Sequence, residues 1–205
     1  SNLKFIVNDD EVAFTSYDKA TGLYTYDAYP IKFEPKYVVD VTGKSLKDLN
    51  TKIGIIKNLK VGTYTDLAVK IADAIANNGS VLYLPYDFEY NEAIDGANFP
   101  DGVVIDNPIT INGNGYTISG NNSNRIFKVN AATTLNNITF VNGSAVEFGG
   151  AIYAVADLTV ANSTFDNNSV AQNYANGGAI MVEASNNDVT LNVNNVKFTN
   201  NKVDN

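Results

Sequence analysis

Aromatic and acidic side chains that could bind a ligand gather between residues 83 and 106. Aromatic faces offer stacking area to a sugar ring, and carboxylates accept hydrogen bonds from its hydroxyl groups. We therefore predict a ligand-binding loop in this segment. Its candidate residues are Tyr86, Asp87, Phe88, Tyr90, Asp95 and Asp101. The simpler alternative is that the segment packs over a neighbouring helix and closes one end of the fold.

The same carboxylates are oxygen ligands of the kind that Ca²⁺ takes in proteins. The sequence has no Asp-x-Asp-x-Asp-Gly loop, however, and Asp95-Gly96 and Asp101-Gly102 are more simply turns. We therefore expect no cofactor, with Ca²⁺ as the single metal left open.

The composition excludes several classes of chemistry. The 205 residues include no cysteine and no histidine, which removes disulfides, thiol catalysis and His-ligated metals. The formal net charge is −8 and no basic stretch is present, so a nucleic-acid partner is not expected. Hydrophobic residues make up 44 %, enough for a folded core.

Catalysis is the main alternative to binding. A polysaccharide hydrolase would need carboxylates facing each other across a groove, and a lyase would need an Arg or Lys base beside bound calcium. The acids of the second half are scattered, and Arg125 is the sole arginine. They include Glu147, Asp157, Asp166, Glu183 and Asp188. We predict a protein that is not an enzyme, and a polysaccharide-active site in the 83–106 loop is the competing hypothesis.

A recurring phrase shows which elements must position these residues. It places an Asn, then a Phe three residues later, then an Asn or Gly three residues after that. Its copies are Asn137, Phe140 and Gly143; Asn162, Phe165 and Asn168; and Asn195, Phe198 and Asn201. A second element, Gly-Gly-Ala-Ile, begins at Gly149-Gly150 and again at Gly177-Gly178. The Phe residues are roughly 25 and 33 positions apart, a period typical of stacked repeats.

The repeat predicts rows of identical side chains, one above another at the strand spacing of about 4.8 Å. Phe140, Phe165 and Phe198 should form an internal aromatic stack. Asn137, Asn162 and Asn195 should form an inaccessible polar ladder, although Asn137 and Asn162 also begin glycosylation sequons. The Gly-Gly pairs should turn a corner with positive φ.

The rest of the chain divides into three predicted parts. Residues 1–44 contain short β-branched and aromatic runs between turns, which indicates a small β unit. Residues 45–80 form a helical linker or cap, with a possible helix start at Ser45 and an amphipathic helix over 66–77 that ends at Gly79. Residues 81–205 carry short strands between Asn- and Gly-rich turns. We predict a mainly β fold in which 81–205 form a right-handed parallel β-helix, truncated at its C-terminal end.

These motifs resemble those of a known group of proteins. Residues 109–118, which read ITINGNGYTI, the Gly-Gly-Ala-Ile elements and the Phe-x-x-Asn phrases look like adhesin-like surface proteins of methanogenic archaea. They are more loosely similar to repeats of chlamydial polymorphic outer-membrane proteins. The resemblance covers roughly residues 63–205, and Gly143 departs from its pattern.

The resemblance implies an extracellular, cell-surface location and a role in adhesion. The partners that it implies are cell-surface glycans or proteins of another cell. We therefore expect a non-catalytic, rigid β-helical stalk or binding module, and a purely structural spacer is a further alternative. No segment of the chain is long and apolar enough to span a membrane. The sequence does not open at Ser1 with a basic-then-apolar leader, so we expect any secretion signal to lie outside it.

Overall fold

A computed structural model describes residues 61–77, 79–172, 175–184 and 188–203 in full, and the backbone of five short strands before residue 43. The chain divides into two units, Ser1–Leu59 and Lys60–Asn205, which are described separately. The helix predicted over 66–77 belongs to the second unit.

The described strands of the first unit form two antiparallel sheets. Strand β1 (Lys4–Val7) pairs with β2 (Asp10–Val12) on one side and with β5 (Val39–Thr42) on the other. Strand β3 (Phe14–Asp18) pairs with β4 (Leu23–Tyr26). The possible helix start at Ser45 lies outside the described residues.

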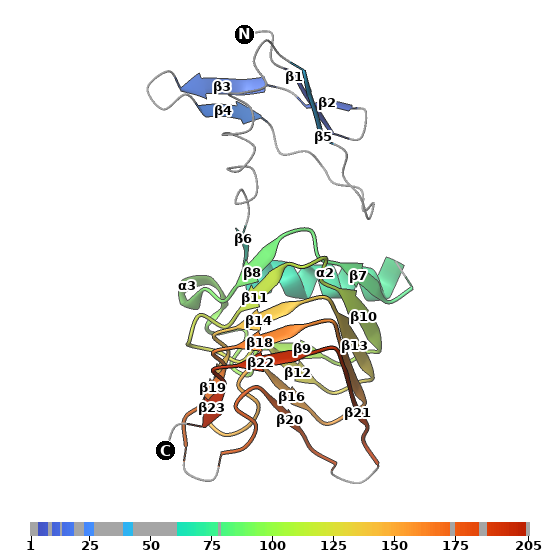
Figure 1. Ribbon diagram of the computed structural model, residues 1–205, viewed down its shortest axis with the longest axis vertical. Helices are drawn as coiled ribbons and strands as arrows, with labels where there is room; N and C mark the ends of the chain where they lie inside the picture. Colours follow the sequence, from blue (N-terminus) through green and yellow to red (C-terminus); the bar gives the residue numbers. More distant parts are fainter. Residues whose placement is uncertain are drawn as a thin grey trace. The chain divides into compact units, whose positions relative to one another are not determined.

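The second unit consists of parallel sheets, as the sequence predicts (Figure 1). The first sheet contains β7 (Val81–Tyr83), β10 (Ile109–Asn112), β13 (Thr133–Asn136), β17 (Leu158–Ala161) and β21 (Leu191–Asn194). The second contains β6 (Val61–Gly62), β8 (Asp87–Glu89), β11 (Thr117–Ser119), β14 (Thr139–Val141), β18 (Thr164–Asp166) and β22 (Lys197–Thr199). The third contains β9 (Val103–Ile105), β12 (Phe127–Val129), β16 (Ile152–Ala154) and β20 (Ile180–Val182). The fourth contains β15 (Ser144–Ala145), β19 (Ser169–Val170) and β23 (Lys202–Val203).

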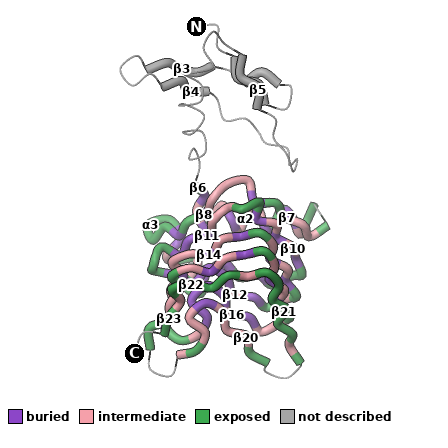
Figure 2. The backbone as a smooth tube through the Cα atoms, viewed as in Figure 1, coloured by how far each residue is buried: buried purple, intermediate pink, exposed green. Residues whose placement is uncertain are grey.

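Strands from successive repeats stack in register. Buried residues occur in every layer of the stack and alternate with less buried ones (Figure 2). In β16 of the third sheet, for example, Ile152 and Ala154 are buried whereas Tyr153 between them is not. This alternation follows from the two-residue period of a β-strand. It decides which side chains hold the fold together and which can meet a ligand.

The predicted aromatic row is confirmed. Phe140 pairs with Phe165, and Phe165 pairs with Phe198. Their ring centroids are 4.6 and 5.1 Å apart, with interplanar angles of 17° and 14°. Phe140 and Phe165 are fully buried, whereas Phe198, in the last repeat, is 48 % exposed.

The prediction of an inaccessible ladder at Asn137, Asn162 and Asn195 is wrong. All three are exposed, and their φ angles lie between 51° and 54°. Asparagine tolerates this left-handed conformation better than other residues with a Cβ, so these positions turn the corner between the first and second sheets. A ladder does exist beside this corner, but Asn136 rather than Asn137 continues it. It runs from Asn195 to Asn162, Asn136 and Asn112 through side-chain hydrogen bonds of 2.9, 2.9 and 3.2 Å.

The interior ladder uses the third position of the phrase instead. Asn168 is fully buried, and its Nδ2 donates to the carbonyl oxygen of Phe140 at 3.1 Å and to Oδ1 of Asn201 at 2.9 Å. Asn201 in turn donates to the carbonyl oxygen of Phe165 at 2.9 Å. In the first copy Gly143 takes this place, and its amide donates to Oδ1 of Asn168 at 2.8 Å. A Cβ on Gly143 would lie 2.4 Å from the carbonyl oxygen of Gly150, which explains the departure from the pattern.

The Gly-Gly corners have two separate causes. The first glycine of each pair has positive φ, 53° at Gly149 and 70° at Gly177, as predicted. The second is required by close packing between repeats. A Cβ on Gly150 would lie 2.3 Å from the carbonyl oxygen of Gly178, and neither backbone can move away from the other.

Helix α2 (Tyr64–Asn77) covers the first repeat, and it contacts β6, β7, β8 and β9. This confirms both the predicted helix and its place over the end of the stack (Figure 1). Thr63 and Asp66 cap its N-terminus reciprocally, with N···O distances of 3.0 and 3.2 Å. At its other end, Gly79 has φ 60°, and the amide of Ser80 donates to the carbonyl oxygen of Ala74 at 3.1 Å.

Candidate functional site

The predicted binding loop between residues 83 and 106 is largely built into the cap of the stack. Phe88 and Tyr90 are 1 % and 4 % exposed and belong to the core, and Asp95 is fully buried. Phe88 and Tyr90 point inward because they occupy alternate positions on and just after β8, next to the outward Asp87 and Glu89. These three side chains therefore present no surface to a ligand.

Asp95 closes the N-terminal end of α2 with its carboxylate. It lies at the end of the short helix α3 (Glu92–Asp95). Its two oxygens accept from the amides of Tyr64, Thr65 and Asn91 at 3.1, 2.9 and 2.9 Å, and from Oγ1 of Thr65 at 2.8 Å. A carboxylate here satisfies amides that have no partner within the helix and complements the positive end of the helix dipole.

The remaining predicted residues do not converge on one place. Asp87 accepts from the amide of Thr117 at 2.7 Å, and so connects β8 to the next repeat. Tyr86 packs on Phe88 with ring centroids 4.9 Å apart, and Nζ of Lys70 lies 5.5 Å from its centroid. The hydroxyl of Tyr90 donates to Glu92 at 2.6 Å, and this bond raises the pKa of Tyr90 to about 12. These contacts favour the packing alternative for most of the segment.

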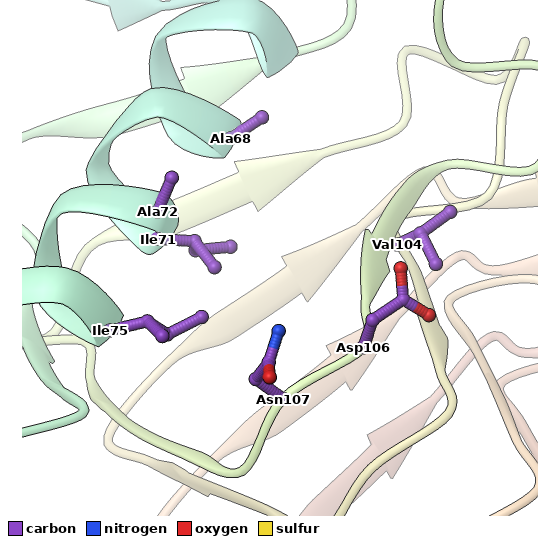
Figure 3. A pocket seen from close by; sticks show the side chains of 7 residues that line it. All are labelled: Ala68, Ile71, Ala72, Ile75, Val104, Asp106 and Asn107. Atoms are coloured by element: carbon purple, nitrogen blue, oxygen red, sulfur yellow. The ribbon is translucent and has the colours of Figure 1, made fainter.

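A cavity of about 290 Å³ lies between α2 and β9 (Figure 3). Apolar side chains from the helix face a rim that contains Asp106 and Asn107. It is lined by Ala68, Ile71, Ala72, Ile75, Val104, Asp106 and Asn107. Asp106 accepts from the side chain of Asn130 at 2.8 Å. The cavity thus offers apolar area with few polar groups to fix a ligand.

Aromatic and charged side chains do meet on the outer side of the third sheet. The register of this sheet places Lys128, Tyr153 and Met181 in one row on β12, β16 and β20. Loop residues before or after these strands add their side chains to the same place. We call this cluster the Tyr153 face, and it comprises Asp101, Arg125, Lys128, Phe148, Tyr153 and Glu183.

Arg125 is the residue that fixes this face. Its guanidinium donates from Nη2 to the carbonyl oxygen of Phe148 at 2.8 Å and from Nε to that of Gly149 at 3.1 Å. It also lies over the ring of Tyr153, 5.5 Å from the centroid. Burial of the guanidinium lowers the pKa of Arg125 from its usual value, but an arginine remains charged in a protein.

Asp101 joins the two cations of the face. It lies 3.3 Å from Arg125 and 3.2 Å from Lys128, and its own side chain is 53 % exposed. The hydrogen bond from Lys128 is the main cause that lowers the pKa of Asp101. Asp101 is therefore the one predicted binding residue that lies in an exposed cluster with an aromatic ring nearby.

Tyr153 and Phe148 supply the aromatic area. Their ring centroids are 5.7 Å apart with an interplanar angle of 30°, and both side chains are partly exposed. The Tyr153 hydroxyl donates to the exposed carboxylate of Glu183, which raises the pKa of the phenol. The face thus combines stacking area, two carboxylates and an ammonium group.

Sequence reasoning missed most of this face, although signals for it exist. Tyr153 follows the inward Ile152 of the Gly-Gly-Ala-Ile element, so strand alternation alone predicts that it faces outward. Arg125 stands out in the sequence as the sole arginine, but the sequence assigns it no role. Its contact with Phe148 joins residues 23 positions apart, which only the register of the stack reveals.

The described residues show neither a metal-binding cluster nor a membrane-spanning helix. Within them, no group of three or more acidic side chains is placed to hold a metal ion. In the same part of the chain, no helix has the length and apolar character required to cross a bilayer.

Comparison of the chain with protein-family models, with curated proteins and with solved structures finds no match. The function must therefore be argued from the geometry of the chain itself.

Proposed function

We propose that this chain is an extracellular, non-catalytic, adhesin-like module: a right-handed parallel β-helix that forms a rigid stalk and attaches to glycans on another cell. Right-handed crossovers are the rule for parallel strands, and the order of strands in the parallel sheets is compatible with such a coil. Repeats that contact only their neighbours produce an elongated support of this kind.

The observation that carries this proposal is the in-register stack. The aromatic row and the Asn168–Asn201 ladder lie in the interior and stabilise the stack. Function is then left to the outward positions, where the strand period places residues such as Tyr153. An adhesive surface needs this combination of a stiff support and exposed contact residues.

The stacked region also supports a non-catalytic role. Two of its acids act as structural acceptors: Asp157 accepts from the amide of Thr190 at 2.7 Å, and Asp166 accepts from Thr199 and Asn200 at 2.7 and 2.8 Å. Carboxylates committed to such bonds do not form the opposed pair that glycoside hydrolysis uses.

The test is a glycan array probed with the full chain, followed by a reducing-sugar release assay on every glycan that binds. Binding without release of reducing ends is the expected result. Turnover of a bound polysaccharide would replace the proposal with the polysaccharide-active enzyme, and the absence of both would leave the structural spacer as the better reading.

A further inference from the structure

The Tyr153 face has the chemistry of a carbohydrate contact surface. A pyranose ring presents C–H groups on one side and hydroxyl groups around its edge. The faces of aromatic rings carry partial negative charge and attract such C–H groups, while the apolar area is removed from water. Tyr153 and Phe148, with ring centroids 5.7 Å apart, offer two adjacent rings for this stacking.

The aromatic platform is held rigid before any ligand arrives. Arg125 has a side chain only 10 % exposed, and it donates to the backbone carbonyl oxygens of Phe148 and Gly149. The left-handed conformation of Gly149 fixes the corner that carries Phe148. Preorganisation of this kind lowers the entropy lost on binding.

The edge of the platform offers hydrogen-bonding groups that suit hydroxyls. Glu183 is exposed and already accepts from the Tyr153 hydroxyl, so its second oxygen can accept from a sugar. Asp101 and Lys128 lie on the side of the earlier repeat and add an acceptor and a donor. Carboxylates that accept from hydroxyls form the stronger, charge-assisted class of hydrogen bond.

The charge balance selects neutral sugars over acidic ones. The two cations of the face, Arg125 and Lys128, are balanced by the two carboxylates of Asp101 and Glu183, so the face has no net charge. The whole chain has a formal net charge of −8. A uronic or sialic acid, or a nucleic-acid strand, therefore finds no excess positive charge at the face and is opposed by the net charge of the chain.

We propose that the Tyr153 face binds neutral pyranose oligosaccharides, stacked on Tyr153 and Phe148 and hydrogen-bonded to Glu183 and Asp101. This inference rests on the proposed function, since it names the ligand class and the contact surface of the adhesive module.

The experiment is isothermal titration calorimetry of the full chain with cellohexaose, xylohexaose and mannohexaose as neutral probes and hexagalacturonate as the acidic probe. At least one neutral probe should bind, and hexagalacturonate should bind at least about tenfold more weakly. Tyr153→Ala should weaken the neutral interaction by about tenfold or more, because it removes a central aromatic contact. Tyr153→Phe, which keeps the ring and loses only the bond to Glu183, should stay within about threefold of the wild type.

Tyr83→Ala is the matched control, because Tyr83 is 41 % exposed on β7 of a different sheet. It should leave every affinity unchanged. Circular dichroism and urea unfolding verify that each variant is folded. If Tyr153→Ala does not fold, Tyr153→Leu keeps the apolar volume without the ring and should show the same loss.

The possible outcomes separate the two proposals. Neutral binding that survives Tyr153→Ala and Tyr153→Leu overturns the Tyr153 face and leaves the adhesive module standing. A preference for hexagalacturonate overturns the ligand class alone. If none of the four probes binds the wild type while the glycan array finds other ligands, the neutral-sugar inference fails. If the array is also blank, the proposed function fails with it.

Discussion

The cap segment, residues 83–106, and the Tyr153 face contain similar side chains that point in opposite directions. In the cap, Phe88 and Asp95 are buried and hold the first repeat and α2 together. On the Tyr153 face, Tyr153 and Glu183 lie at the surface and do not hold other elements together in this way. Aromatic and acidic composition is therefore a poor guide to a binding site. Whether a residue occupies an inward or an outward position along its strand is a good one.

The largest expected effect comes from truncating one phenylalanine in each region. Phe88→Ala should lower the free energy of unfolding by about 3–5 kcal/mol, because it opens a cavity in the core under α2. Phe148→Ala should cost about 1 kcal/mol or less, since that ring is only partly buried. Urea unfolding followed by circular dichroism measures both. Equal losses of unfolding free energy for the two variants would contradict the contrast between a core residue in the cap and a surface residue on the Tyr153 face.

The two acids Asp95 and Asp101 give a second, smaller contrast. Asp95→Ala should cost about 3 kcal/mol, because three backbone amides and one hydroxyl lose their acceptor in a buried site. Asp101→Ala should cost less than about 1 kcal/mol, since Asp101 is 53 % exposed and Arg125 keeps the carbonyl oxygens of Phe148 and Gly149 as acceptors. The same unfolding experiment compares them. If Asp95→Ala instead keeps the stability of the wild type but no longer binds glycans, the binding site lies in the cap and not on the Tyr153 face.

The two asparagine ladders extend the comparison into the stack. Asn168→Ala should cost about 2 kcal/mol, because the buried Gly143 amide and Phe140 carbonyl lose their partner. Asn162→Gly should cost less than about 1 kcal/mol, since it is exposed and glycine accepts the same positive φ without strain. Thermal unfolding of both variants measures the difference. A larger loss at Asn162 would show that the outer ladder stabilises the stack.

The asparagine phrase also shows how far the sequence could predict the fold. The row of Phe140, Phe165 and Phe198 was predictable because identical apolar residues recur once per repeat and can only stack inward. The roles of the asparagines were not predictable, because the same residue type serves two purposes. At Asn162 it turns a solvent-exposed corner with positive φ, whereas at Asn168 it satisfies buried backbone groups.

The candidate site was harder to predict for a related reason. The alternation of Asp87, Phe88, Glu89 and Tyr90 already indicates that the two aromatics share one face of a strand, but not whether that face is inside. The Tyr153 face depends on contacts between repeats, such as that of Arg125 with the Phe148 carbonyl. Such contacts follow from the lengths of loops that lie between the recurring motifs, and these lengths differ from repeat to repeat.

The smallest expected effect concerns pH and isolates Asp101. Its pKa is lower in the folded chain than the ordinary 3.8, chiefly because Lys128 donates a hydrogen bond to it. A lowered pKa means that Asp101 contributes stability above its unfolded pKa and loses that contribution as the pH falls through the folded value. Because the carboxylate is 53 % exposed, screening keeps this contribution below about 0.5 kcal/mol.

The free energy of unfolding of the wild type is lower at about pH 3 than at about pH 7. In Asp101→Asn this difference between the two pH values should be smaller by less than about 0.5 kcal/mol. Asp166 also has a lowered pKa, caused first by its bond from Thr199, so the wild type loses stability over the same range for a second reason. Comparing wild type and Asp101→Asn at each pH cancels this shared loss. A variant whose unfolding free energy depends more steeply on pH than that of the wild type would contradict this interpretation. It would mean that Asp101 is held in place by strain rather than by its two cations. The edge of the Tyr153 face would then be less ready for a ligand than its geometry indicates.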